Sequence, residues 1–129
     1  MAELIVFPDV EQLLIDYLTP TLAVPVGTAV PNPRPTSFVT VNRFGGPRRG
    51  LVVDYAQLGF EYWAERESQA AQLAQLVRAH INALQGQRVN GVQVYRVREF
   101  AGPANLPDPL SGQPRYVQQF GVQVRGTAL

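Results

Sequence analysis

Residues 51–86 decide the fold of this chain, and they read LVVDYAQLGFEYWAERESQAAQLAQLVRAHINALQG. In the first part, 51–64, apolar side chains hold the even positions apart from Asp54, while Gln57 and Glu61 hold odd ones; this alternation is typical of a strand with one buried face. The second part changes to helical spacing, and one stripe contains Ala70, Leu73, Ala74, Val77, Ile81 and Leu84. The stretch predicts a long strand, then an amphipathic helix with a polar first turn at 65–68 and a C-cap at Gly86.

Upstream of this stretch, the pattern predicts one more helix and two more strands. Asp9 is a good N-cap, Gln12 stands where a capping box needs it, and apolar residues recur at helical spacing over 10–19. Prolines then leave room for only a short edge strand at 22–26. Residues 36–44 are β-branched and aromatic, so we expect them to form a hairpin with 51–64 around the glycine-rich turn 45–50.

Downstream, two further strands are expected on either side of a long loop. Residues 89–98 have mixed parity, which suggests a bulge, and 116–125 alternate clearly, with Phe120 on the buried side. The proline-rich stretch 100–114 has no periodicity, and such loops are often functional. We therefore predict one α+β domain over residues 1–129. It has a mainly antiparallel β-sheet with two amphipathic helices packed on one face, and the hairpin and proline-rich loop protrude.

Composition excludes several classes of protein. The chain is 46% hydrophobic and 16% charged, which excludes a disordered chain, and it has no apolar run long enough to span a membrane. Its net charge of +1 argues against a nucleic-acid binder that works by broad counterion release. It has no cysteine, which removes disulfides and thiolate metal sites. The N-terminal stretch lacks the features of a signal peptide, so we expect intracellular synthesis.

The residues of catalysis are scarce. The single histidine, His80, lies at the margin of a helical stripe, where a packed or solvated side chain is commoner than a metal ligand. No serine stands in a G-x-S-x-G elbow, and the acidic cluster 54–67 has no feature that selects paired-carboxylate chemistry. The segment 45–50 lacks the Walker lysine and leads into a strand, so it is a hairpin tip. We expect no enzyme activity, no cofactor and no metal.

Two protruding segments, the hairpin tip 45–50 and the proline-rich loop 100–114, are the candidate interface for a protein partner. All eleven basic residues are arginines, which suit interfaces through bidentate pairing, although codon usage is the simpler explanation. Apolar side chains in a long loop need a covering surface, either their own domain or another chain. The candidate interface residues are Arg43, Phe44, Arg48, Arg49, Phe100, Leu106, Asp108, Leu110 and Arg115. The alternative is that both segments fold back onto their own domain.

From about residue 9 to 126 the chain resembles the tail terminator or tail-completion proteins of long-tailed, siphovirus-type bacteriophages, of the kind found in actinobacterial phages and prophages. The similarity rests on 30–35, on Phe38–Val41 leading to Gly45-Gly46, and on the motifs of the long strand and second helix. These motifs are Val53-Asp54, 60–64, Ala70, 73–74 and 77–78. The segments 111–116 and 122–126 also fit.

The resemblance implies a structural role in the virion, at the head-tail junction of the tail. Such subunits form a homo-oligomeric ring, usually a hexamer, on the tail tube protein; they end tube polymerisation and offer a docking face to the head-tail connector or stopper protein. Genomic DNA passes through the lumen without sequence-specific binding, and no cofactor or membrane is implied. The alternatives are a head-completion or stopper subunit and a small ligand-binding accessory domain.

Overall fold

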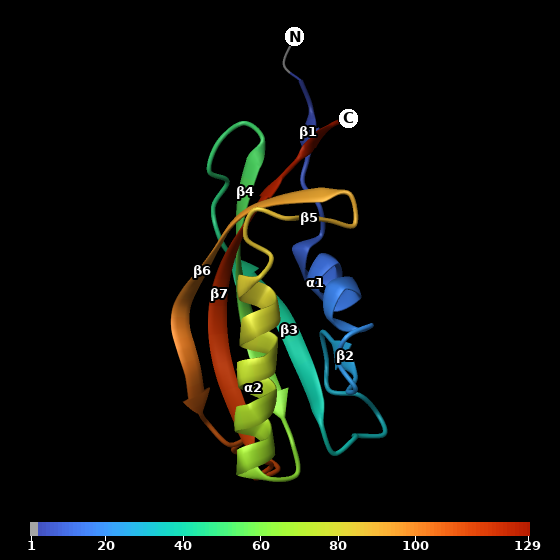
Figure 1. Cartoon of the computed structure of the whole chain (residues 1–129), viewed down its shortest axis with the longest axis vertical. Helices are drawn as coiled ribbons and strands as arrows, with labels where there is room; N and C mark the ends of the chain where they lie inside the picture. Colours follow the sequence, from blue (N-terminus) through green and yellow to red (C-terminus); the bar gives the residue numbers. More distant parts are fainter. Residues whose placement is uncertain (1–2) are drawn as a thin grey trace.

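Two helices and eight strands make up the computed structural model (Figure 1), which describes residues 3–129. Met1 and Ala2, the start of the stretch in which no signal peptide is expected, lie outside the described residues. The helices are α1 (Val10–Leu18) and α2 (Glu67–Asn82). The strands are β1 (Ile5–Val6), β2 (Val26–Gly27), β3 (Phe38–Gly45), β4 (Val53–Trp63), β5 (Arg88–Val89), β6 (Val92–Asn105), β7 (Arg115–Arg125) and β8 (Thr127–Ala128).

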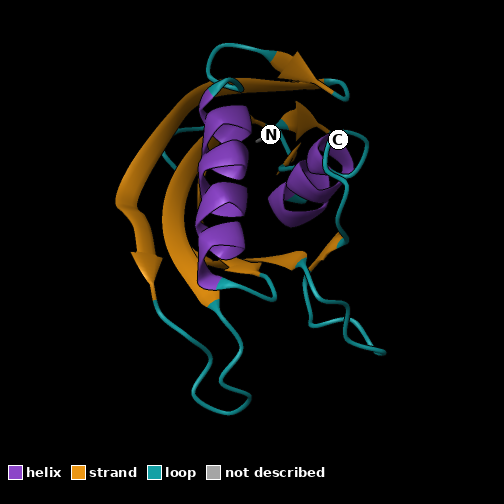
Figure 2. Ribbon diagram, turned by 60° about the horizontal axis from the view of Figure 1, so that its bottom comes forward, coloured by secondary structure: helices purple, strands orange, loops and turns teal. Residues whose placement is uncertain are grey.

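The main sheet has six strands in the order β2-β3-β4-β7-β6-β5, and only the β2–β3 pair is parallel. Both helices pack on one face of this curved sheet, as Figure 2 shows. The predicted α+β class, the mainly antiparallel sheet and the one-sided helices are therefore confirmed. No helix within residues 3–129 combines the length and hydropathy needed to cross a membrane.

Helix α1 begins as its sequence predicts. The Asp9 side chain accepts a hydrogen bond from the backbone N–H of Gln12, which satisfies one of the free donors of the first turn. The Gln12 side chain, expected to complete a capping box, donates instead to Asp16 one turn later, at 2.8 Å. Val10, Leu13, Leu14 and Leu18 are buried against the sheet, so the apolar stripe anchors the helix.

Helix α2 differs slightly from its prediction at the C-terminal end. The helix ends at Asn82 with Ala83 as C-cap, so the assignment of Gly86 as the cap was wrong. Gly86 has a φ of +77° and lies in the turn that follows, where a left-handed backbone favours glycine. At the N-terminal end, the Gln69 side chain accepts from the backbone N–H of Arg66, at 3.2 Å.

The core lies between the helices and the even-numbered side chains of β4 and β7. Phe60 pairs with Gln118 across these strands, and Leu58 pairs with Phe120, so both strands direct the same parity inward. Phe60 packs edge-on against Phe120, with ring centroids 5.5 Å apart. The predicted inward direction of Phe60 and Tyr62 is confirmed, because both side chains are fully buried.

Strand β6 corrects the prediction of a loop over 100–114. The strand continues to Asn105, so Phe100 and the Gly102-Pro103 pair belong to the sheet, and the loop covers only 106–114. Three register shifts interrupt the pairing of β6 with β7, which confirms the expected bulge and explains the mixed parity. Pro103 is tolerated because this part of β6 has a neighbouring strand on one side only.

The two ends of the described chain pair with each other. Ile5 lies opposite Ala128 and Val6 opposite Thr127 in a separate two-stranded sheet, which the sequence analysis did not predict. Of the short strand expected at 22–26, only Val26 is in a strand, the two-residue β2, and residues 22–25 are irregular.

Candidate interaction surfaces

The face of the sheet opposite the helices is not covered by any helix or strand of residues 3–129 (Figure 2). It contains a shallow hollow with a cavity volume of about 330 Å³, lined by Phe44, Gly59, Ala101, Gly102, Ala104 and Val117 among others. The small residues on neighbouring strands create the depression, and the half-exposed Phe44 ring borders it. We call this surface the outer face.

Trp63 lies on the outer side of β4, as the alternation predicts, yet only 3% of it is exposed. Its ring stacks on Phe38 with centroids 5.1 Å apart, and the guanidinium groups of Arg34 and Arg115 lie 5.4 and 5.2 Å from the ring. Arg115 also forms an ion pair with Glu61 at 2.9 Å. Trp63 is therefore covered by its own chain.

Arg43 is a structural residue of the hairpin. Its guanidinium binds both carboxylate oxygens of buried Asp54, at 2.7 and 3.0 Å, and also donates to the carbonyls of Gly45 and Gly46. The hydrogen bonding to Asp54 raises the pKa of Arg43 above its ordinary value. Gly46 is required beside it, because its φ is +100° and a side chain there would collide with the carbonyl of Tyr55.

The hairpin tip is less free than its sequence indicates. Arg48 donates to the carbonyls of Gly50 and Leu51 and lies over the ring of Phe7, and Arg49 lies 4.9 Å from the ring of Tyr55. Each of these two guanidinium groups lies over an aromatic ring, as expected if this segment folds back onto its own domain. Their contact with a partner stays a prediction, as does that of exposed Phe44.

The loop 106–114 is held in one conformation by hydrogen bonds. The backbone N–H of Leu106 bonds to the carbonyl of Arg115, and Arg34 donates to Ser111 and Gln113. The Asp108 carboxylate accepts from the backbone and the hydroxyl of Ser111, and these hydrogen bonds lower the pKa of Asp108. The loop therefore presents Leu110, 95% exposed, on an ordered support.

Of the other candidate residues, Leu106 is half-exposed and Phe100 is 41% exposed. Phe100 packs against Tyr55 on the outer face, with ring centroids 5.9 Å apart. The structure does not bring the nine candidates together. The hairpin tip and the loop 106–114 lie at opposite ends of the elongated molecule (Figure 1).

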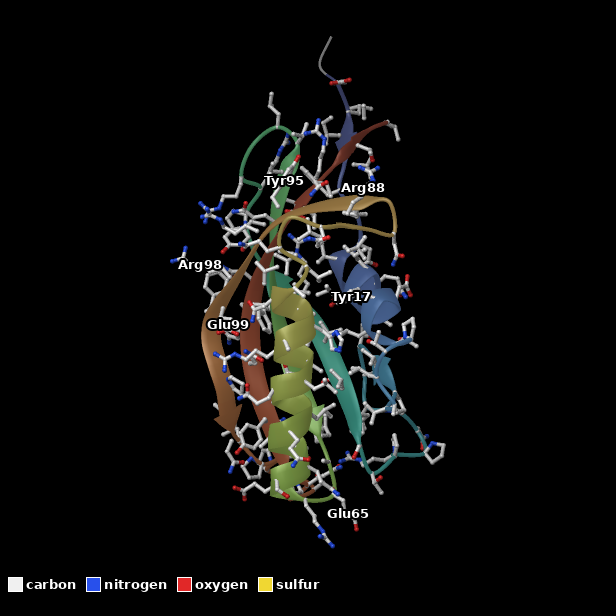
Figure 3. All side chains as sticks on the ribbon, in the orientation of Figure 1. Tyr17, Glu65, Arg88, Tyr95, Arg98 and Glu99 are labelled. Carbon is white, nitrogen blue, oxygen red and sulfur yellow. The ribbon has the colours of Figure 1, made fainter. Side chains whose placement is uncertain are left out.

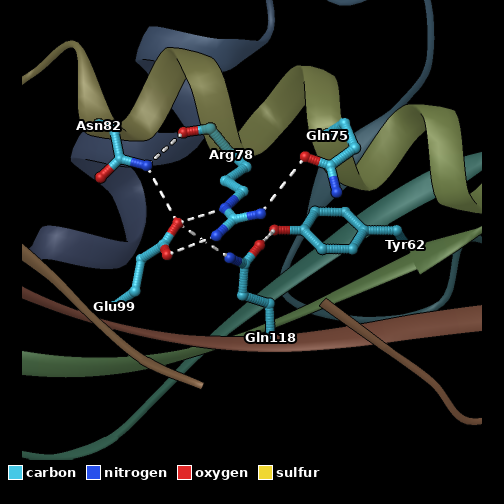
Figure 4. Close-up of polar contacts among 6 residues, drawn as sticks. All are labelled: Tyr62, Gln75, Arg78, Asn82, Glu99 and Gln118. Atoms are coloured by element: carbon cyan, nitrogen blue, oxygen red, sulfur yellow. Dashed lines mark hydrogen bonds and ion pairs between the residues drawn. The ribbon is translucent and has the colours of Figure 1, made fainter. Parts of the chain in front are cut away.

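A polar network joins helix α2 to strands β4, β6 and β7 (Figure 4). Arg78 binds Glu99 through two contacts of 2.6 and 2.8 Å, and Asn82 donates to the same carboxylate. The hydroxyl of buried Tyr62 donates to Gln118 at 2.7 Å, and Gln118 donates onward to Glu99. The ion pair with Arg78 lowers the pKa of Glu99, and burial raises that of Tyr62.

Among the described residues, no group of three histidine, aspartate or glutamate side chains is placed to hold a metal ion. His80 is half-buried, and its ring lies edge-on to the ring of Tyr17 with centroids 6.3 Å apart. The Tyr17 hydroxyl donates to the backbone carbonyl of His80 at 2.9 Å.

Sequence reasoning missed a basic surface next to β6. Figure 3 shows Arg98 at the outer margin of this strand, and its neighbours on the outer face include Arg96 and Arg125. The two arginines of β6 stand two positions apart, a spacing that places both on one face of a strand. This signal was hidden because the bulges of β6 obscured its alternation.

Comparison with known proteins shows a similarity in fold. No protein-family model and no curated protein sequence matches this chain. In fold, the chain is similar to a chain in the solved virion of a native gene transfer agent (GTA) particle, with a TM-score of 0.54 and 15% sequence identity over 78% of each chain. At this identity, the likeness establishes a shared fold.

Proposed function

We propose that this protein is a structural subunit of a virion, and that it forms a homo-oligomeric ring that caps the tail tube. The observation that carries the proposal is the fold likeness to a chain of a virion particle, at a TM-score of 0.54. The sequence resemblance to tail terminator proteins supports the more specific role. In that role the ring ends polymerisation of the tube protein and provides the docking face for the head-side connector.

The arrangement of the protrusions fits a cap. A subunit between a tube and a connector needs two separate contact regions on opposite sides, and the hairpin tip and the loop 106–114 lie at opposite ends of the molecule (Figure 1). Each end exposes a large apolar side chain, Leu51 at 80% and Leu110 at 95%. Exposed leucines on ordered supports suit protein contacts, because little conformational entropy is lost on docking.

A ring multiplies these contacts. Each subunit repeats the same two protrusions around the symmetry axis, so individually weak contacts add up to a firm attachment. The proposed role is mechanical, and it uses no cofactor and no catalytic group.

The experiment is removal of this protein from the virus that encodes it, followed by electron microscopy of the tails. We expect tubes of uncontrolled length that do not join heads, and mass measurement of wild-type tails should give one small ring per tail. Tails of normal length that fail to join heads would instead indicate a head-completion subunit. Normal infectious particles without the protein, or dozens of copies along each tail, would contradict the proposal.

A further inference from the structure

Four exposed arginines gather at one end of the sheet, on the outer face: Arg49, Arg96, Arg98 and Arg125. Arg125 donates to the hydroxyl of Tyr95 at 3.0 Å, and Arg49 lies over Tyr55, which packs against Phe100. We call this surface the arginine patch. The three ion pairs within residues 3–129 join Arg43, Arg78 and Arg115 to their carboxylates and include none of these four. The patch therefore keeps its charge available to a partner.

The edge of the sheet beside the patch has no neighbouring strand. Strand β5 pairs only with Val92 and Gln93 of β6. The side-chain oxygen of Gln85 accepts a hydrogen bond from the backbone N–H of Val97. Pro103 and the register shifts make the remaining edge unsuitable for regular addition of another strand. A partner at this edge is therefore held through side chains.

The complementary charge lies at the other end of the sheet, on α1. Asp9, Gln12 and Asp16 occupy one exposed stripe of this helix and are joined by hydrogen bonds of 3.2 and 2.8 Å. Figure 3 shows α1, marked by Tyr17, on the side of the molecule opposite Arg98. Helix α1 packs at the β2–β3 end of the sheet order, and the arginines of the patch on β6 belong to the opposite end.

Asp16 stands where its own helix disfavours it. It lies in the last turn of α1, near the negative end of the helix dipole, and that turn contains no basic residue. The hydrogen bond from Gln12 offsets part of this unfavourable interaction with the dipole. The exposed carboxylate also remains open to a contact outside the helix.

We propose that the arginine patch of one copy of this chain docks against the acidic stripe of α1 in the next copy around the ring. The inference rests on the proposed ring, because a closed ring of identical subunits needs two different, mutually complementary surfaces on each subunit. The chain is almost neutral overall, at +1. Exposed arginines nevertheless lie on β6, and exposed aspartates lie on α1 at the other end of the strand order. Such a chain is complementary to itself in a head-to-tail arrangement.

The main competing occupant is the phosphate backbone of a nucleic acid, which arginines and aromatic rings also bind. The structure favours a second copy for two reasons. The acidic stripe supplies a matching surface within the same chain. The aromatic rings are engaged with their neighbours, because Tyr95 accepts from Arg125 and Phe100 is tilted by 48° against Tyr55.

The experiment is a charge-reversal cycle on the full chain, measured by sedimentation and native mass spectrometry at low and high ionic strength. Arg96→Glu with Arg98→Glu reverses the patch, Asp16→Arg reverses the stripe, and a fourth protein combines all three changes. Arg66→Glu with Arg88→Glu is the matched control, because both side chains are exposed and lie outside the patch. Binding of a fluorescent DNA duplex is measured on the same proteins.

We expect each one-sided reversal to weaken self-association at low salt by about tenfold or more, and the combined variant to recover it. Asp16→Arg should leave the melting temperature unchanged or raise it, since it places a cation at the helix C-terminus. A wild-type chain that does not self-associate at low salt at its highest soluble concentration would overturn the inference. So would one-sided variants that assemble normally, or a combined variant that stays dissociated.

Loss of duplex binding with intact assembly would assign the patch to nucleic acid. If the charge-reversal variants do not change self-association as expected while rings still form on tails, the contact between subunits lies elsewhere. The proposed function would then still hold. A virus that completes its tails without this protein would remove the proposed function itself.

Discussion

Gly121 of β7 lies directly beneath the ring of Tyr55 on the outer face, so that a methyl group at Gly121 would lie 2.5 Å from Cε1 of Tyr55 and 2.8 Å from the Phe100 ring. Gly121→Ala should destabilise the fold by about 1–3 kcal/mol, because the added atom must displace two packed rings. Gly59→Ala is the matched control: its new Cβ would meet Phe44 at an ordinary 3.8 Å. Urea denaturation of both variants checks this. If the two variants are equally stable, the rings of Tyr55 and Phe100 move aside at little cost in free energy.

Phe60→Ala tests the register of the central strands. The side chain is fully buried against Tyr62 and Phe120, so its loss should cost about 3–5 kcal/mol of unfolding free energy. Phe44→Ala, at a half-exposed position, should cost less than about 1 kcal/mol. An unchanged melting temperature for Phe60→Ala would be incompatible with an inward Phe60.

Arg43→Ala should be destabilising through Asp54. The substitution leaves a buried carboxylate without its guanidinium partner, which costs about 3 kcal/mol. Arg48→Ala removes an exposed side chain that donates to the carbonyls of Gly50 and Leu51 and lies over the Phe7 ring, and we expect a loss of less than about 1 kcal/mol. Thermal denaturation of both variants at neutral pH makes the comparison. If Arg43→Ala melts like the wild type, Arg43 does not stabilise the fold, and contact with a partner is the role left for it.

Glu99 makes part of the stability dependent on pH. Because the pKa of Glu99 is lowered from 4.5 in the folded chain, its stabilising contribution is complete above that value and is lost as the pH falls through the folded pKa. Glu99→Gln should therefore cost about 1–2 kcal/mol at neutral pH and progressively less in acid. Glu65→Gln, at an exposed position outside the ion pairs, is the control. A difference from the wild type that does not shrink in acid would contradict the ion-pair explanation.

Leu110→Ser tests the loop 106–114 as a contact region. The side chain is 95% exposed, so the melting temperature should not change, while tail completion in the infected host should fall sharply. Leu76→Ser, at an exposed position on α2, should leave both unchanged. If Leu110→Ser yields normal particle numbers, the tip of this loop does not contact a partner.

The sequence predicted those elements whose signals are local. Helix α1 has its N-cap and apolar stripe within ten residues, and β4 alternates regularly over 56–62, so both were found close to their observed bounds. Strand β6 was cut short because Gly102, Pro103 and the register shifts remove the alternation on which its recognition depends.

Contacts between distant segments could not be predicted in the same way. The Arg78–Glu99 ion pair joins residues 21 positions apart, and its formation depends on how α2 lies across β6. The sequence context of the hairpin-tip arginines is turn-like and does not indicate which rings they contact. Only the folded chain brings Phe7 beneath Arg48 and Tyr55 beneath Arg49.

The hydrogen bond between Tyr62 and Gln118 selects one alignment of β4 and β7 from several that their apolar residues would accept. A slip by two residues would keep the same parity facing the helices, so apolar burial alone distinguishes such alignments poorly. Gln118 distinguishes between these alignments, because its amide is buried on that face and the amide oxygen needs a hydrogen-bond donor. In a slipped alignment, the amide would lose Tyr62 at a penalty of about 1–3 kcal/mol. The pair therefore stabilises the observed alignment of β4 and β7 relative to slipped ones.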